Sequence, residues 1–225
     1  MKKVKTLKKR WIHIVLLLFL AAGVAVPTIA GTYSYYTSSS DAQNRIITKG
    51  SGVYLQEVFN PDDLWLPGET KKKEVHFGNH SELDQVIRFK VTEAWYDNNG
   101  TPDDLSDDIL LPATWWAGSY SPAPAVINWT TEITGGVEWV KIENWYYYTK
   151  ILTKAGGGNP VTLPVINSVT FSNVISNAGP GALDDFSDKR YSLTIQMESL
   201  DVSTIMTTEA WGVAFSESGG RLTWT

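Results

Sequence analysis

The chain has 225 residues, a formal net charge of −5 and no cysteine. The absence of cysteine excludes disulfide bonds, a thiol nucleophile and a cysteine-bound zinc site. The acidic balance disfavours nucleic acids and anionic lipid surfaces as partners, because both repel negative charge. Ten tryptophans and ten tyrosines offer large apolar areas for a core without disulfide bonds.

The first 30 residues have the pattern of an export signal. Six basic residues lie between positions 2 and 10, and an apolar run follows from Trp11 to Ala30. In such signals the basic head stays in the cytoplasm while the apolar run enters the bilayer. An uncleaved membrane anchor is the competing interpretation, because about 20 apolar residues span a hydrocarbon core. Pro27 and the small residues before Ala30 favour cleavage.

We therefore predict a signal helix and a signal peptide over residues 1–34, with the cleavage site between 30 and 42. Its removal leaves 13 basic and 24 acidic residues, a net charge of −11. The next segment, 35–52, is polar and is expected to be a flexible N-terminal leader that carries Ile46 and Ile47. This leader is interpreted either as a strand that adds to another subunit or as an idle N-terminus.

Beyond the leader, apolar residues come in short alternating runs. In 85–96, Arg88 and Lys90 alternate with Ile87 and Phe89, which is the period-two pattern of a half-buried strand. The same pattern predicts strands at 53–59, 73–79, 85–96, 137–142, 145–152, 168–175, 190–199 and 209–216.

The aromatic run 145–148 follows the same rule. Alternation places Tyr146 and Tyr148 on one face of the sheet and Trp145 and Tyr147 on the other. At least half of these side chains are therefore expected in the core.

Turn-forming residues separate the predicted strands, and the only mature helices we expect are short, at 184–188 and 202–207. Short strands broken by turns are typical of an all-β protein. We predict a two-sheet antiparallel sandwich, jelly-roll-like, in a single domain over 53–225. Two stretches, 97–108 and 117–126, are expected to be loop insertions within the region 97–126.

The first of these loops carries candidate calcium ligands. The hard oxygen atoms that Ca²⁺ prefers come from Asp97, Asn99, Asp103 and Asp104. The spacing does not match an EF-hand, because the glycine is misplaced and no glutamate follows at the twelfth position. A solvated acidic loop is the alternative. Asp107 and Asp108, in the same loop, are also expected to be solvated rather than catalytic.

Two further residue pairs have alternative interpretations. Trp115 and Trp116 lie beside a Gly-Ser loop, so exposed rings there would suit the stacking of sugars and a carbohydrate-binding module. His76 and His80 are four residues apart, which is a zinc spacing on a helix, but no HExxH motif is present. We interpret the segment as a strand that runs into a turn.

A series of sequence blocks covers almost the whole chain in a particular order and spacing: 31–37, 44–50, 55–57, 65–68, 73–79, 87–95, 145–148, 151–152 and 209–211. In this order and spacing, rather than in any one block, the chain resembles the TasA, camelysin and BsaA-like proteins, which are exported through an alternate signal.

The resemblance implies a dedicated signal peptidase that acts on the precursor. Its recognition element would comprise Gly31, Thr32, Tyr33, Ser34, Tyr35 and Tyr36. It also implies a jelly-roll-like protein of a biofilm matrix or fibre, which polymerises when the N-terminal strand of one subunit fills a gap in the next. Camelysin has been described as a metalloprotease, but the missing HExxH motif argues against that activity here.

We therefore expect a secreted structural protein of an extracellular matrix or cell-surface fibre, without catalysis and without a required cofactor. Its partners would be other copies of itself or a related matrix subunit, and only an uncleaved signal would hold it in a membrane. A secreted carbohydrate-binding module is the second interpretation, and a metal-dependent hydrolase is the third.

The signal assignment predicts the N-terminus of the secreted protein. Because the apolar run is expected to be cleaved, intact-mass spectrometry of the secreted chain should find a first residue between 31 and 42. A secreted or membrane-bound product that retains Met1 to Ala30 would contradict the assignment.

Overall fold

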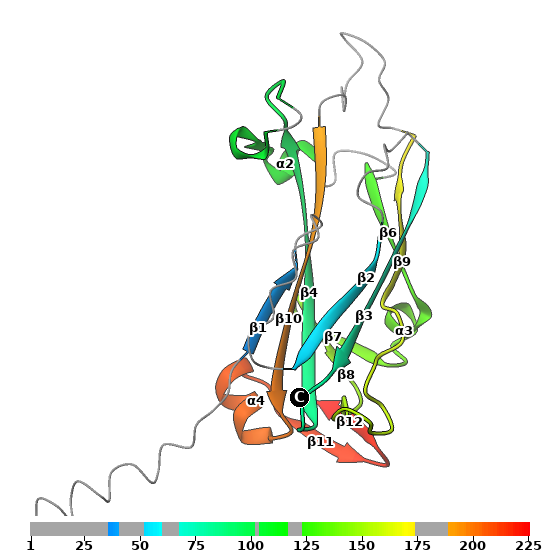
Figure 1. The fold of residues 1–225 in the computed structure, drawn as a ribbon, viewed down its shortest axis with the longest axis vertical. Helices are drawn as coiled ribbons and strands as arrows, with labels where there is room; N and C mark the ends of the chain where they lie inside the picture. Colours follow the sequence, from blue (N-terminus) through cyan, green and yellow to red (C-terminus); the bar gives the residue numbers. More distant parts are fainter. Residues whose placement is uncertain (1–35, 41–51, 60–67, 102–103, 117–122, 174–188) are drawn as a thin grey trace, which may run out of the picture. The chain divides into compact units, whose positions relative to one another are not determined.

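Two antiparallel sheets form the body of the protein (Figure 1). The computed structural model describes residues 36–40, 52–59, 68–101, 104–116, 123–173 and 189–225, all within a unit that runs from Ser34 to Thr225. The predicted signal peptide and signal helix lie outside the described residues. Among the helices of the described ranges, none is long and apolar enough to cross a membrane.

Sheet A has the strand order β1-β10-β4-β8-β7, with the short β5 also paired to β4. Its members are β1 (Tyr36–Ser40), β4 (Gln85–Asp97), β5 (Ile109–Leu110), β7 (Trp139–Ile142), β8 (Trp145–Tyr148) and β10 (Lys189–Asp201). The long strands β4 and β10 are paired over their full lengths, from Lys189 opposite Asp97 to Asp201 opposite Gln85. They therefore form the centre of the sheet.

Sheet B has the order β2-β3-β9-β6. Its members are β2 (Val53–Val58), β3 (Thr70–Asn79), β6 (Ala125–Trp129) and β9 (Ile166–Phe171). Short helical segments lie between strands: η1 (Leu105–Asp107), α2 (Ala113–Trp116) and α3 (Thr131–Thr134). Position 78 of β3 requires glycine, because a Cβ there would lie only 2.2 Å from Cζ of Tyr54 on the neighbouring strand.

One hydrophobic core fills the space between the two sheets. It combines alternate residues of strands from both, including Val75 and Phe77 of sheet B with Ile87, Phe89 and Met197 of sheet A. Ring contacts cross the layer, since the centroids of Phe77 and Phe89 are 5.1 Å apart. Burial of such aromatic faces is the dominant favourable contribution to folding.

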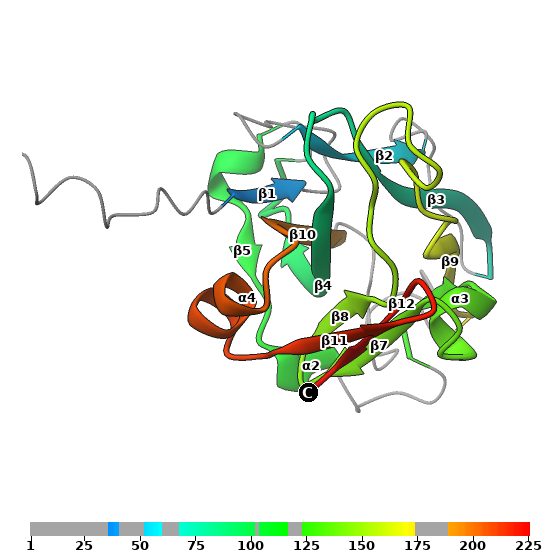
Figure 2. The same ribbon diagram turned by 90° about the horizontal axis from the view of Figure 1, so that it is seen from below.

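A second core covers the opposite face of sheet A. There α4 (Thr204–Trp211) and the hairpin of β11 (Phe215–Ser218) and β12 (Arg221–Trp224) pack on the sheet (Figure 2). We call residues 203–225 the C-terminal layer. Its Trp211, Leu222 and Trp224 contact Val86, Tyr147 and Leu200 of sheet A. Around these residues sheet A is thus covered on both faces.

The ends of α4 follow from local sequence. The side chain of Ser203 accepts a hydrogen bond from the backbone N–H of Met206, which caps the first turn. Gly212 adopts φ 71° and ends the helix in the left-handed conformation that glycine tolerates. The predicted strand at 209–216 is therefore wrong, because residues up to Trp211 are helical and β11 begins at Phe215.

Most predicted strands are confirmed within one to four residues of their predicted ends, and so is the all-β antiparallel character. The assignment of faces in β8 is also confirmed, since Tyr146 and Tyr148 contact the inter-sheet core while Trp145 and Tyr147 contact the second core. The short helix predicted at 202–207 corresponds to the first half of α4. The helix predicted at 184–188 lies outside the described residues.

Two segments expected to lack regular structure contain strands. Residues 36–40 of the predicted flexible leader form β1, which pairs with β10. Residues 125–126, at the end of the predicted loop 117–126, begin β6. In both cases backbone pairing with a neighbouring strand prevails over a polar or Pro-rich local sequence.

The C-terminal layer predicts a sharp contrast between two adjacent residues. Trp224 is buried and its Nε1 donates a 2.9 Å hydrogen bond to the carbonyl of Tyr148, whereas Thr223 is exposed. Trp224→Ala should lower the free energy of unfolding by about 3–5 kcal/mol, and Thr223→Ala by no more than about 0.5 kcal/mol. Urea denaturation measures both, and equal losses would show that β12 does not pack as described.

Candidate functional site

A row of residues crosses sheet A from its interior to its edge. In the register of the sheet, Tyr147 of β8 lies opposite Arg88 of β4, Arg88 lies opposite Glu198 of β10, and Glu198 lies opposite Thr37 of β1. Residues directly opposite in antiparallel strands have their side chains on the same face. The row therefore connects the centre of the sheet to its N-terminal edge strand.

The charged members of this row form a buried ion pair. Arg88 Nη2 and Nε donate to Glu198 Oε2 at 2.7 and 3.0 Å, and the two side chains are only 9% and 4% exposed. Arg88 Nη1 donates to the hydroxyl of Tyr147 at 2.9 Å. The other carboxylate oxygen, Oε1, accepts from Gln196 Nε2 at 3.3 Å. Both oxygens of Glu198 are therefore occupied.

Aromatic rings enclose the guanidinium group. The Arg88 Cζ atom lies 4.1 Å from the ring centroid of Trp145 and 4.7 Å from that of Trp211 in α4. Cation–π contacts of this kind strengthen when the cation is removed from water. The C-terminal layer thus contributes directly to the position of Arg88.

Disruption of this ion pair would lower stability by more than the intact pair raises it. Two charges lose their hydration on burial, so the intact pair adds little net stability. Removal of one partner, however, leaves the other charge buried without compensation, at about 3–5 kcal/mol. The hydrogen bonds and rings around Arg88 and Glu198 hold both groups in one arrangement.

The edge of sheet A beside this row is occupied by the N-terminal strand. Tyr36 to Ser40 pair antiparallel with Ser199 to Ile195 of β10. The other side of β10 pairs with β4, so β10 has one edge at which a single further strand can pair, and β1 occupies that edge. Such a site binds mainly through main-chain hydrogen bonds.

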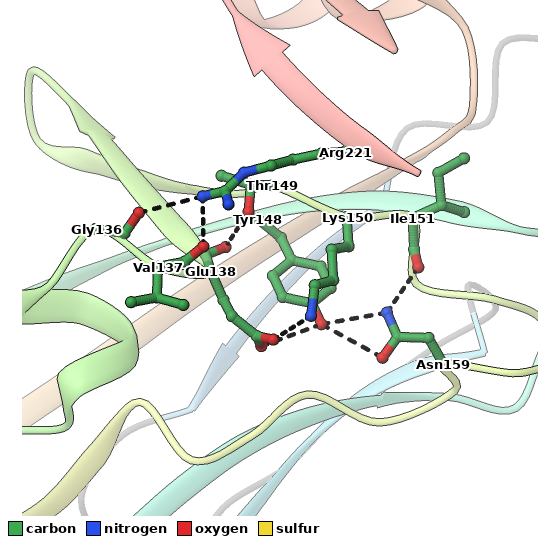
Figure 3. Close-up of polar contacts among 9 residues, drawn as sticks. All are labelled: Gly136, Val137, Glu138, Tyr148, Thr149, Lys150, Ile151, Asn159 and Arg221. Carbon is green, nitrogen blue, oxygen red and sulfur yellow. Dashed lines mark hydrogen bonds and ion pairs between the residues drawn. The ribbon is translucent and has the colours of Figure 1, made fainter. Parts of the chain in front are cut away.

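A second polar cluster joins the C-terminal hairpin to sheet A (Figure 3). Glu138, which is 6% exposed, accepts a hydrogen bond from Lys150 Nζ and lies 3.5 Å from the donating hydroxyl of Tyr148. The same hydroxyl accepts from Asn159 Nδ2 at 3.2 Å. The carbonyl of Glu138 accepts from the hydroxyl of Thr149 at 3.0 Å.

Burial, together with the negative charge of Glu138, raises the pKa of Tyr148 to about 12, although the hydrogen bond from Asn159 opposes this shift. The phenol therefore stays neutral at physiological pH and is no general base there.

Arg221 of β12 donates to the carbonyls of Gly136 and Val137, at 3.3 and 2.5 Å from Nη2. This cluster fastens β12 to the β7–β8 hairpin.

The predicted calcium ligands Asp97 and Asp104 are engaged with separate partners. Asp97 binds Lys189 at 2.9 Å and accepts from the backbone N–H of Asn99, and both hydrogen bonds lower its pKa. Asp104 accepts from the hydroxyl and backbone N–H of Ser106, which likewise lowers its pKa. Asp103 lies outside the described residues. Within the described ranges, no three His, Asp or Glu side chains form a group suited to a metal ion.

The expectation that Asp108 is solvated is wrong. Its side chain is 4% exposed and accepts a 2.7 Å hydrogen bond from Nε of Arg190 in β10. Sequence spacing alone could not reveal this partner, which lies 82 residues away. Asp107 accepts from the hydroxyl of Thr101 at 2.7 Å.

The remaining predicted site residues are placed as follows. Trp116 is half-buried and packs against the inter-sheet core, which corrects its expected exposure, and the side chain of Trp115 is not among those described. His76 lies within β3, as expected, and His80 follows the strand with its ring stacked on Tyr54 at 4.2 Å. The signal-processing residues Gly31 to Tyr35 and the assembly residues Ile46 and Ile47 lie outside the described residues.

Comparisons with protein-family models, with curated proteins and with solved structures gave no match. The resemblance to exported matrix proteins therefore stays a prediction. One feature of the sequence points to this site: Arg88 lies between apolar residues, with Val86 and Ile87 before it and Phe89 after it. A charged residue amid apolar neighbours in a strand suggests a buried partner when the outer face is covered.

The Tyr148 cluster predicts a specific pH dependence. An ordinary tyrosine ionises near pH 10, so between about pH 10 and 12 the folded state retains a proton that the unfolded state loses, and stability falls as pH rises. Tyr148→Phe should cost about 1 kcal/mol at pH 7 through lost hydrogen bonds. It should also show a shallower alkaline loss of stability in denaturant titrations. An unchanged slope would contradict the described environment of Tyr148.

Proposed function

We propose that the protein is a secreted structural subunit of an extracellular matrix or cell-surface fibre, and that copies associate by strand addition at the edge of β10. The observation that carries this proposal is the pairing of β1 with residues 195–199 of β10. No catalytic role and no required cofactor are proposed. The jelly-roll-like wiring and the N-terminal signal helix belong to the same proposal.

The composition of β1 favours exchange between subunits. Its sequence, Tyr-Thr-Ser-Ser-Ser, contains no aliphatic residue, and its register with β10 is one of backbone pairing that a second copy can supply equally well. The equivalent segment of a second copy would restore the same hydrogen bonds. Exchange of an identical element is a low-cost route to association, and repeated head-to-tail exchange produces a fibre.

Processing of the precursor would make this exchange possible. The proposed recognition element ends at Tyr36, where β1 begins. A dedicated signal peptidase that cleaves before Tyr36 would release β1 from the apolar head and leave it free to pair with a neighbour. Cleavage after Ser40 would instead remove β1 and open the edge of β10 to a related matrix subunit.

Proline substitution tests this function. Consecutive residues of a strand direct their N–H groups alternately, so Ser38→Pro with Ser39→Pro removes one donor that faces β10, whichever residue supplies it. With the full chain expressed in a bacterium that exports it, electron microscopy of the secreted material should show fibres for the parent. We expect at least a tenfold reduction in fibre mass for the proline variant.

A matched control separates pairing from local sequence effects. Ser38→Thr with Ser39→Thr keeps both N–H groups and favours an extended backbone, so its fibres should equal those of the parent. Undiminished fibres in the proline variant would reject assembly through β1, and fibres absent from the parent would reject the structural role itself.

A further inference from the structure

We propose that Arg88 is a positioning residue that keeps the edge of β10 open to a strand, and that Trp211 of the C-terminal layer supports it. The proposal rests on the proposed function for its consequence in assembly. The pairing it concerns is present within a single chain, because β1 occupies the edge of β10.

Charged side chains are the usual means by which edge strands avoid pairing. The segment of β10 that pairs with β1 reads Ile-Gln-Met-Glu-Ser from 195 to 199, so Glu198 is its single charged residue. An unpaired carboxylate would need water, and a strand laid beside it at the position of Thr37 would restrict that water. A free Glu198 would therefore oppose strand addition.

Arg88 removes this obstacle. Its Nη2 and Nε both bind Oε2 of Glu198, and the carboxylate is held over the face of the sheet, where its side chain is 4% exposed. Gln196 binds the other oxygen. The edge of β10 then offers backbone groups without a competing charge.

The C-terminal layer holds Arg88 in turn. Trp211 of α4 stacks on the guanidinium group at 4.7 Å, on a different element from Trp145 at 4.1 Å in β8. The chain from 203 to 225 therefore bears on the pairing of residues 36–40, although the two lie at opposite ends of the sequence. The coupling passes through one buried ion pair.

An engineered disulfide measures how strongly β1 stays paired with the edge of β10. The chain contains no cysteine, and Tyr36 lies directly opposite Ser199, so Tyr36→Cys with Ser199→Cys creates a single reporter pair. The full chain, purified in mild detergent, is equilibrated in a glutathione buffer. The fraction oxidised gives the effective concentration of β1 at the edge, whether the bond forms within a chain or between chains.

In this reporter background, Arg88→Met should lower the effective concentration about tenfold or more, because Glu198 is left charged and unpaired. Adding Glu198→Gln should restore it to within about threefold of the parent, since the charge that opposes pairing is gone. Trp211→Leu should give an intermediate loss.

A second buried ion pair supplies the matched control. Glu57 of β2 and Lys73 of β3 are bonded to each other, with side chains 7% and 3% exposed, but they lie in sheet B. Lys73→Met should reduce stability to a similar degree while leaving the effective concentration at the edge unchanged. A loss equal to that of Arg88→Met would show that general destabilisation, rather than the local charge, releases β1.

Each outcome decides the proposal. A folded Arg88→Met variant with the parent's effective concentration overturns it, and so does a double variant that stays low. If near-ultraviolet circular dichroism shows that Arg88→Met is unfolded, Arg88→Gln replaces it, because glutamine keeps a hydrogen-bond donor but removes the charge that compensates Glu198. Arg88→Gln should then lower the effective concentration, and an unchanged value overturns the proposal. Disulfides found only within chains would count against fibre assembly and not against the role of Arg88.

Discussion

The buried pair of Arg88 and Glu198 is the interaction on which the rest of the structure depends. It links the two long central strands, which are paired in register from end to end, and it contacts aromatic rings from β8 and α4. A buried pair adds little net stability but makes any arrangement that separates its members costly. We propose that it specifies one packing of the C-terminal layer and one environment for the N-terminal edge.

Aromatic packing supplies the stability that the ion pair does not. Sheet A separates two cores, one shared with sheet B and one covered by α4 and the β11–β12 hairpin. Strand β8 contributes to both, because Tyr148 faces one core and Tyr147 the other. In a chain without disulfide bonds this two-sided burial stabilises the centre of the sheet, while the edge strand β1 depends on backbone hydrogen bonds.

The alternation of apolar and polar residues predicted those strands whose conformation is determined by their own sequence. Alternation located the long strands β4 and β10 and assigned the faces of β8 correctly, because a pleated strand must send successive side chains to opposite sides. It failed at 209–216, where the cap at Ser203 and the left-handed Gly212 decide in favour of a helix. It also missed β1 and the start of β6, whose strand character comes from a neighbouring strand rather than from their own residues.

The candidate site was harder to predict, since its partners are distant in sequence. Arg88 and Glu198 are 110 residues apart. Alternation assigned Arg88 to the polar face of a half-buried strand, because the neighbours of Arg88 in sequence do not show which element covers that face. Asp108 was misjudged for the same reason, as its partner Arg190 is 82 residues away. Residue type and spacing indicated an acidic loop and an export signal, but only the topology brought the ion pair to the edge strand.

The most direct measurement is a cryo-electron microscopy structure of the secreted protein in its assembled form. The account predicts that the strand beside residues 195–199 of β10 belongs to a neighbouring subunit and places that subunit's Thr37 opposite Glu198, with Arg88 still bound to the carboxylate. Subunits that contact one another elsewhere while each retains its own β1 at this edge would contradict it.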